Sequence, residues 1–292
     1  MKLIADSGAT KTEWVIIQGN NELQKVQTIG FNPYFIHSEG ILHELEKNLY
    51  PFLDNDQVEE VFFYGAGCSN PRNCDIVGDA MKAFFRHATI AVEHDLLGAA
   101  RALCGHDPGI ACILGTGSNS CYFDGTVIRK NIPSLGFILA DEGSGAYIGR
   151  QLVRDYFLGA MPSGIKKKFE SRYDLTLERV LDAVYNKPHP NRYLASFTLF
   201  LSDEKEQPYI HQVITSSFDA FFTTQVMKYK KYRQLPLHAV GSVAFYFKDL
   251  LMEAAERHGI QVEKILHTPI EGLVRFHTSD WRIANSERRK KY

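Results

Sequence analysis

Two short glycine-rich segments each follow an apolar run and precede a second run that alternates like a β-strand. The first is Asp6-Ser-Gly-Ala-Thr-Lys-Thr12, and the second is Gly115-Thr-Gly-Ser-Asn119. A tight turn without bulky side chains lets backbone N–H groups close around phosphate oxygens. One such turn is weak evidence, but two at matching places in the two halves of the chain indicate a duplication. The pair therefore predicts a duplicated fold that binds a nucleotide.

Several carboxylates occupy positions suited to phosphoryl transfer. Asp6 ends the first predicted strand, where it could hold a hydrated Mg²⁺ beside the first loop. Asp95 follows a predicted strand at 88–93 and begins a helix, where a general base could lie. Each has a structural alternative, because the first loop could be an ordinary hairpin turn and Asp95 could be a helix N-cap. Asp141, next to Glu142, could bind sugar hydroxyls or cap a helix.

The elements that must position these residues follow the same order in both halves. Each half contains three meandering strands and then alternating helices and strands, which predicts an α/β fold with mixed sheets and helices on both faces. Ligands of such sheets collect at the carboxyl ends of the strands. A turn-rich connector at 105–109 predicts one domain over 1–106 and another over 107–292, with a helical insertion at about 160–235.

Two of the predicted helices have specific expected ends. Ser38 is expected to be the N-cap of a helix over 38–50, whose apolar residues recur on one face. A second helix is expected at about 244–258, after a strand at 237–240.

Composition excludes several classes of partner. Of 292 residues, 45% are hydrophobic and 23% are charged, and the formal net charge is −1, which is typical of a soluble globular protein. We therefore expect neither nucleic acid nor membrane as a partner, and a solvated tail at the basic cluster 288–291. The five cysteines include no CxxC pair, which favours a reducing, cytoplasmic compartment.

Six motifs in a fixed order resemble one known family, the N-acetylglucosamine kinase branch of the BadF/BadG/BcrA/BcrD ATPase family in the actin and hexokinase superfamily. The resemblance covers nearly the whole chain, and its motifs are the two glycine-rich loops, Phe31-Asn32-Pro33, Asp95, Asp141-Glu-Gly-Ser-Gly145 and Val240-Gly-Ser-Val243. It implies duplicated ribonuclease H-like (actin-like ATPase) domains as two lobes around a cleft. It also implies ATP and Mg²⁺ as cofactors, a small sugar as substrate, and a homodimer as a possible assembly.

The resemblance also implies a role for each matching residue. Asp6 would bind the metal and Asp95 would be the catalytic base. The ATP and phosphate contacts would come from Gly8, Thr10, Lys11, Gly115, Thr116, Gly117, Gly241 and Ser242. The sugar contacts would come from Asn32, Ser118, Asn119, Gly136 and Asp141. Leu135 replaces a tryptophan of the vertebrate sugar kinases and Ala140 replaces a glycine, which leaves the identity of the sugar open.

Three functions compete on this basis. The leading one is an ATP-dependent kinase of an amino sugar such as N-acetylglucosamine or glucosamine. The second is an ATPase that activates a dehydratase through an iron–sulfur cluster, for which Cys112 and Cys121 flank the second loop. Both lie in apolar strand patterns, which favours buried side chains. The third is a non-catalytic sugar sensor, against which Asp95 argues. The ROK sugar kinases are disfavoured because their cysteine-rich zinc signature is missing.

Overall fold

The computed structural model describes residues 1–8, 10–19 and 21–278. The chain divides into two compact units. Unit 1 comprises Met1–His106 together with the segment that begins at Pro269, and unit 2 is Asp107–Thr268. The basic cluster at 288–291 lies outside the described residues.

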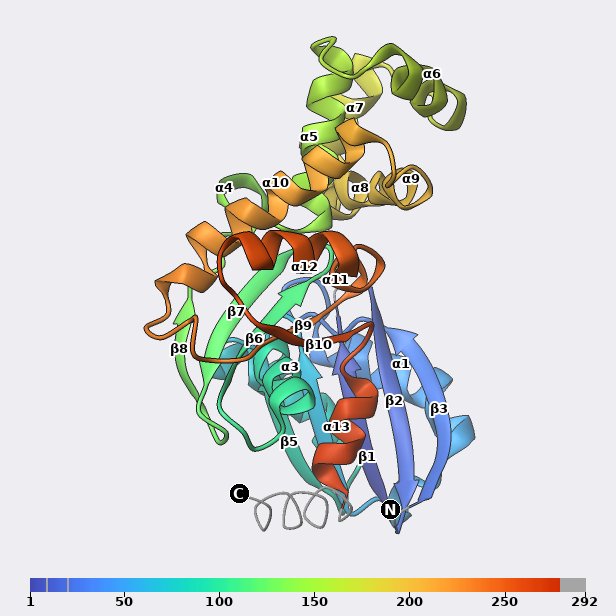
Figure 1. Ribbon diagram of the computed structural model, residues 1–292. Coiled ribbons are helices and arrows are strands. Elements are labelled where there is room, and N and C mark those ends of the chain that lie inside the picture. The colour runs from blue at the N-terminus through green and yellow to red at the C-terminus, as the bar shows by residue number, and fades with distance from the viewer. Residues whose placement is uncertain (9, 20, 279–292) are drawn as a thin grey trace. The chain divides into compact units, whose positions relative to one another are not determined.

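Unit 1 is built on a five-stranded mixed sheet with the order β3-β2-β1-β4-β5 (Figure 1). β2 pairs antiparallel with β1 and β3, whereas β4 pairs parallel with β1 and β5. The strands are β1 (Lys2–Ser7), β2 (Lys11–Gln18), β3 (Asn21–Ile29), β4 (Glu60–Gly65) and β5 (Thr89–His94). The three consecutive antiparallel strands followed by parallel ones are the order that the sequence predicts.

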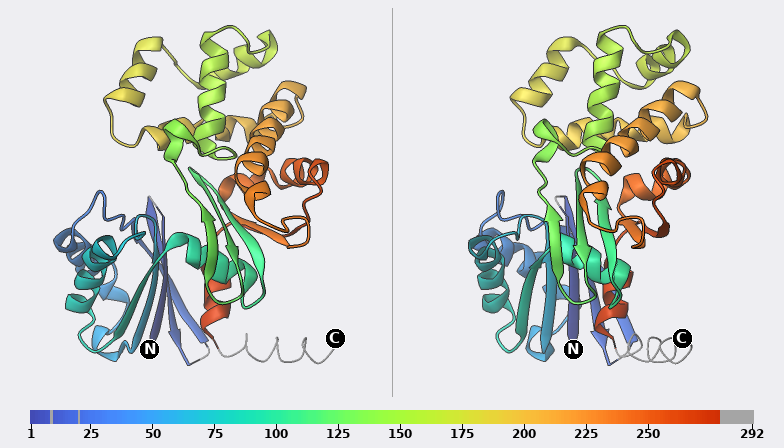
Figure 2. Two further views of the ribbon diagram at one scale, coloured as in Figure 1. Left: turned by 90° about the vertical axis from the view of Figure 1, so that its left-hand side faces the viewer. Right: turned by 60° about the vertical axis from the view of Figure 1, so that its left-hand side comes forward.

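Helices cover both faces of this sheet, because successive strand residues point to opposite sides. Leu3, Ala5 and Trp14 pack in one apolar cluster with residues of α1 and α2, and Ile4 and Val15 pack in another with residues of α3 and α13. Figure 2 shows α13, in red, on the side of the sheet opposite α1 and α2. The helices are α1 (Ser38–Asn48), η1 (Tyr50–Phe52), η2 (Asn55–Gln57), α2 (Pro71–Phe84), α3 (Asp95–Cys104) and α13 (Ile270–His277).

Unit 2 repeats the strand order of unit 1. Its sheet runs β10-β9-β6-β7-β8, with β6, β9 and β10 parallel and β6, β7 and β8 antiparallel. The strands are β6 (Gly109–Leu114), β7 (Ser118–Phe123), β8 (Ile128–Ile132), β9 (Leu237–Val240) and β10 (Val262–Leu266). The repeated order confirms the predicted fold class of duplicated actin-like domains with mixed sheets.

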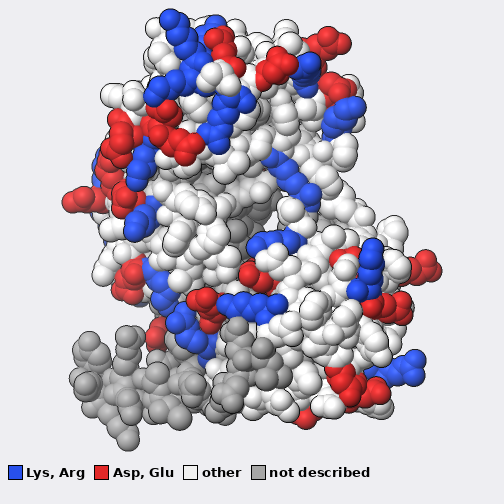
Figure 3. Space-filling model, turned by 90° about the vertical axis from the view of Figure 1, so that its right-hand side faces the viewer, with Lys and Arg blue, Asp and Glu red and all other residues white. Residues whose placement is uncertain are grey.

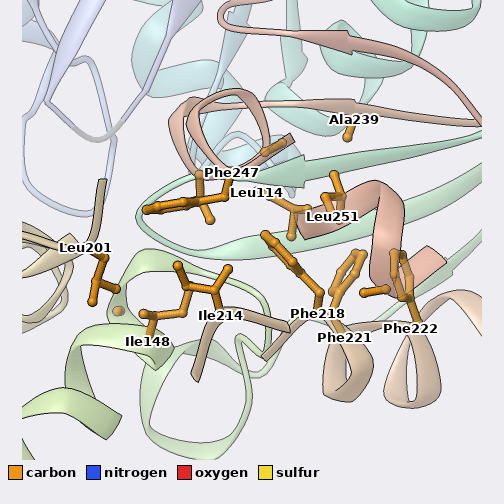
Figure 4. Packing of buried hydrophobic residues seen from close by; sticks show 14 of the residues in the cluster. Leu114, Ile148, Leu201, Ile214, Phe218, Phe221, Phe222, Ala239, Phe247 and Leu251 are labelled. Atoms are coloured by element: carbon orange, nitrogen blue, oxygen red, sulfur yellow. The ribbon is translucent and has the colours of Figure 1, made fainter. Parts of the chain in front are cut away.

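The helices of unit 2 share one apolar core with its sheet. Phe218, Phe221 and Phe222 of α10 are fully buried in it, beside Leu251 of α12 and Leu114 of β6 (Figure 4). The helices are α4 (Gly136–Leu139), α5 (Gly145–Phe157), α6 (Ser163–Arg172), α7 (Leu177–Tyr185), α8 (Pro190–Ser196), α9 (Thr198–Asp203), α10 (Pro208–Thr224), η3 (Val226–Lys228), α11 (Ser242–Tyr246) and α12 (Lys248–Arg257).

Three local expectations are wrong. The cap of α1 is His37 rather than Ser38, because the Ser38 hydroxyl donates to the carbonyl of Ile76 instead (2.7 Å). The helix expected at 244–258 is two helices that meet at Phe247, whose ring is buried in the core of unit 2. The last helix, α13, belongs to unit 1 and not to the domain expected over 107–292.

Among the described residues, no helix has the length and apolar character needed to cross a bilayer. On the face shown in Figure 3, acidic and basic side chains are interspersed.

Candidate active site

The first glycine-rich loop is a tight turn between β1 and β2. The Gly8 N–H donates to the carbonyl of Lys11 (3.0 Å), and the Gly30 N–H donates to the carbonyl of Thr10 (3.0 Å). Gly8, Thr10 and Lys11 are all exposed. The turn therefore presents a hydroxyl and a cation to solvent without bulky side chains, which is the arrangement that phosphate binding needs.

Two buried hydroxyls beneath this turn were missed by the sequence analysis. Thr12 donates to the carbonyl of Ile29 (2.8 Å), so the Ser7 hydroxyl donates to Thr12 (2.8 Å) and accepts from the N–H of Phe31 (2.9 Å). Ser7 and Thr12 are fully buried. Together they fix the turn to the segment that leads to Asn32. The sequence feature that could have revealed them is that Ser7 and Thr12, both hydroxyl residues, flank the glycine turn.

Asp6 lies in β1 among other acidic side chains. Its partner across the antiparallel ladder is Glu13, and Asp95 is close enough for its charge to act on Asp6. Burial, followed by the charges of Asp95 and Glu13, raises the pKa of Asp6 to about 7, and Lys11 opposes this change. A divalent cation at this position would relieve the repulsion between carboxylates.

Asp95 is the first residue of α3, directly after β5. Its Oδ1 accepts from the N–H of Leu96 (2.8 Å), and burial raises the pKa of its carboxyl group. The N-cap of α3 is His94, whose Nδ1 accepts from the N–H of Leu97 (3.2 Å). The proposed structural role of Asp95 as the cap is therefore filled by its neighbour.

Asn32 follows β3 and occupies a tight turn. Its Oδ1 accepts from the N–H of Tyr34 (3.0 Å), and a Cβ atom at Gly67 would lie only 2.5 Å from that oxygen. Within the described residues, the Nδ2 group of Asn32 makes no hydrogen bond. The side chain thus has its oxygen occupied and its donor group available for a ligand.

The second glycine-rich loop joins β6 to β7 in unit 2. The Gly115 N–H donates to the carbonyl of Gly117 (3.0 Å). The N–H groups of Gly145 and Ala146, at the start of α5, donate to the carbonyls of Gly115 (2.8 Å) and Thr116 (3.1 Å). The helix N-terminus therefore fixes the conformation of the loop.

The turn after β9 lies directly against this second loop. A Cβ atom at Gly241, where φ is +123°, would come within 2.4 Å of the Leu114 carbonyl oxygen and 3.1 Å of the Gly115 nitrogen. Only glycine permits this approach and this backbone conformation. Ser242, which is exposed, begins α11 at the same place. Gly115, Gly241 and Ser242 thus lie together in unit 2.

Asp141 is buried beside the second loop with its backbone in the left-handed region, at a φ of 62°. It accepts from the hydroxyl of Ser134 (3.2 Å) and from the N–H of Ser118, and a Cβ atom at Gly117 would lie 3.0 Å from its Oδ2. Burial raises the pKa of its carboxyl group. Ser144, rather than Asp141, caps α5.

Two further predicted sugar contacts, Gly136 and Asn119, lie in α4 and β7 of unit 2. Gly136 begins α4 with a φ of +75° and has open space around its Cα atom. The Oδ1 of Asn119 accepts from the Nδ2 of Asn131 (2.9 Å) and from the N–H of Ser120 (2.9 Å), so the oxygen of this amide is engaged within the sheet.

Among residues 1–8, 10–19 and 21–278, no group of three or more His, Cys, Asp or Glu side chains could hold a metal ion. Mg²⁺ commonly takes only one or two carboxylates and completes its shell with water and phosphate, so Asp6 fits that ion. Cys112 and Cys121 are fully buried in β6 and β7, whereas a cluster shared between subunits needs accessible thiols.

No protein-family model matches the chain, and no curated protein matches it. A solved structure from Porphyromonas gingivalis, named as a candidate N-acetylglucosamine kinase, shares 41% identity with a TM-score of 0.91 and covers 95% of this chain and 98% of its own.

Two more distant structures share the fold. A candidate N-acetylglucosamine kinase from Chromobacterium violaceum is 15% identical, with a TM-score of 0.65, over 94% of this chain and 98% of its own. A ROK family glucokinase from Streptomyces griseus, solved with glucose and AMPPNP, is 17% identical, with a TM-score of 0.56, over 94% and 97%. The identity to the first structure over nearly all of both chains establishes that this protein belongs to the N-acetylglucosamine kinase-like family of actin-fold proteins.

Proposed function

We propose that this protein is an ATP-dependent sugar kinase that transfers the γ-phosphate to a hydroxyl of an amino sugar of the N-acetylglucosamine or glucosamine type. The similarity to a candidate N-acetylglucosamine kinase at 41% identity supports the reaction class. The substrate class comes from the name of that relative.

The observation that carries the proposal is the state of Asp95. If the Asp95 carboxylate capped α3, helix stability would explain why an aspartate is present there. His94 is the N-cap of α3 instead. Burial raises the pKa of Asp95 and thereby makes its carboxylate a stronger proton acceptor. A general base works best when its pKa approaches the operating pH, so this environment suits a group that accepts the proton of a sugar hydroxyl.

The backbone loops would bind the phosphates. Gly8, Thr10 and Lys11 in unit 1 and the segment 115–117 in unit 2 offer N–H groups, hydroxyls and one cation. Gly241 and Ser242 would accept the adenosine portion of ATP. Because phosphoryl transfer is catalysed mainly by positioning and charge stabilisation, these groups and one base are sufficient protein machinery.

Asp6 would hold Mg²⁺, which would neutralise charge on the transferred phosphoryl group. The sugar would be oriented by the Nδ2 group of Asn32 in unit 1. In unit 2 the candidate sugar contacts are Ser118, Asn119, Gly136 and Asp141. Asp141 is held by two hydrogen bonds, so its carboxylate is preorganised before a sugar arrives.

The test is a panel of hexoses and hexosamines with ATP and Mg²⁺, scored by ADP release and by mass spectrometry of the phosphorylated sugar. We expect an N-acylated or free 2-amino hexose to give the highest kcat/KM. The Asp95→Asn variant serves as the control, with activity at least about a hundredfold lower. ADP release that does not depend on any sugar would contradict the kinase assignment and favour an ATPase.

A further inference from the structure

The position of Asp95 depends on the whole of α3. Its own polar contact, with the N–H of Leu96, lies within the same helix. Nothing in that contact fixes the helix against the sheet. The groups that do so lie one to two turns further along α3, at Gly98, Arg101 and Ala102.

Gly98 rests on the side chain of Tyr64 in β4. A Cβ atom at Gly98 would come within 2.8 Å of the Tyr64 Cβ and Cγ atoms, so only glycine lets the helix lie this close to the strand. Tyr64 itself is buried, with 1% of its surface exposed. The Tyr64 side chain therefore packs directly against the first half of α3.

Ala102, in the second half of α3, touches α13. A Cβ atom at Gly272 would lie 2.5 Å from the Ala102 carbonyl oxygen and 2.8 Å from its Cβ, so the two backbones are in direct contact. Ile270 and Leu273 of α13 are buried in the apolar cluster that contains Ala102 and Tyr64. α13 and Tyr64 thus hold α3 from two directions.

A chain of hydrogen bonds joins the three elements. The Nη1 of Arg101 in α3 donates to the hydroxyl of Tyr64 in β4 (2.8 Å), and that hydroxyl lies 2.8 Å from the Nε2 of His277 in α13. Burial, together with the charges of Arg101 and Lys2, lowers the pKa of His277 to about 3, so the imidazole is neutral and can accept from Tyr64.

Aromatic contacts extend the same junction. His277 stacks on Phe62 of β4 with ring centroids 3.9 Å apart, and the Arg101 guanidinium lies 5.4 Å from the centroid of Phe276. The Nε atom of Arg101 is buried and lacks a hydrogen-bond partner among the described residues.

We infer that α13 sets the position of Asp95 through α3, with Tyr64 and His277 as positioning residues for the base. This inference rests on the proposed function. Residues 267–269 alone connect β10 of unit 2 to α13. The helix that orients the base, α13, therefore follows β10 directly in the chain. β10 is paired with β9, and β9 ends at the Gly241 turn.

Tyr64→Phe is the primary test, because it keeps the ring under Gly98 and removes both hydrogen bonds. Small misplacements of a catalytic group have large effects on rate, so we expect kcat for sugar phosphorylation to fall about tenfold while KM for ATP changes less than about twofold. His277→Leu should have the same effect, and His277→Gln, which can still accept, should restore most of the rate. Tyr50→Phe, at an exposed tyrosine of the same unit, is the matched control.

A double-mutant cycle separates positioning from general destabilisation. If Tyr64 acts through the base, Tyr64→Phe should change the residual rate of Asp95→Asn by less than about twofold. An equal loss in both backgrounds, or a loss explained by the unfolded fraction in a thermal melt, would overturn the inference. So would wild-type kcat in Tyr64→Phe while Asp95→Asn is inactive, and the proposed function would then stand. A wild-type protein that phosphorylates no sugar would overturn both.

Discussion

Replacing Asp6 with asparagine should stabilise the ligand-free protein while it impairs catalysis. In the folded protein, burial and the neighbouring Asp95 and Glu13 raise the pKa of Asp6 from 3.8 to about 7. One pKa unit corresponds to about 1.36 kcal/mol, so the ionised form carries a penalty of up to roughly 4 kcal/mol. Asp6 retains some solvent contact, which screens its charge, and we expect a gain of about 2 kcal/mol from Asp6→Asn at pH 8.

The gain has a defined pH dependence. Between about pH 4 and pH 7 the folded protein keeps a proton on Asp6 that the unfolded chain has lost, so the stability of the wild type falls as the pH rises. Asparagine does not titrate, and the advantage of Asp6→Asn should therefore be small at about pH 4 and complete above about pH 8. For a protein of this size, about 2 kcal/mol corresponds to roughly 4–8 °C in Tm.

The assay is a series of thermal melts at several pH values, for the wild type, Asp6→Asn and the matched control Asp79→Asn. Asp79 is exposed on α2, and its substitution should leave Tm unchanged. Mg²⁺ with ADP should raise the Tm of the wild type more than that of Asp6→Asn, and the variant should phosphorylate sugar more slowly. A variant that is less stable than the wild type at pH 8 would refute the reasoning, because Asp6 would then be held by favourable contacts.

Four further substitutions test separate parts of the site. Asp95→Asn should lower sugar phosphorylation at least about a hundredfold, the lower end for loss of a general base, without lowering Tm; preserved turnover would contradict its role. His94→Ala should instead lower the free energy of unfolding by about 1 kcal/mol in urea titrations, because it removes the cap of α3. Gly241→Ala places a Cβ atom 2.4 Å from the Leu114 carbonyl and should cost more than about 2 kcal/mol, measured in the same way. Gly115→Ala, with open space around it, should keep its stability and lose nucleotide affinity in calorimetric titrations.

Local sequence patterns were sufficient for the sheets and for the turns between their strands. The apolar run 2–5 and the glycine at position 8 define β1 and its turn without reference to the rest of the chain. The same holds for 110–114 and Gly115. Repetition of that pattern made the duplication visible, and the observed strand orders match it.

Local patterns could not predict which residues would meet in the fold. His94 replaces Asp95 as a cap because the imidazole accepts from Leu97, a choice that either residue type permits. The attachment of α13 to unit 1 depends on the direct contact between Gly272 and Ala102, which are far apart in sequence. The role of the Ser7 and Thr12 hydroxyls, which is to fix the first loop, depends on the contact of Ser7 with the distant N–H of Phe31.

The return of α13 to unit 1 has a consequence for synthesis on the ribosome. Ile4, Val15 and Ile17 are buried in the cluster that α13 completes. α3 covers part of this face early, but the nascent chain must wait for unit 2, about 160 residues long, before α13 completes the cover, which takes roughly ten to thirty seconds at cellular rates of translation. During that interval the exposed apolar face is a natural binding surface for chaperones, and a circular permutant that begins at Pro269 would emerge with its first domain complete.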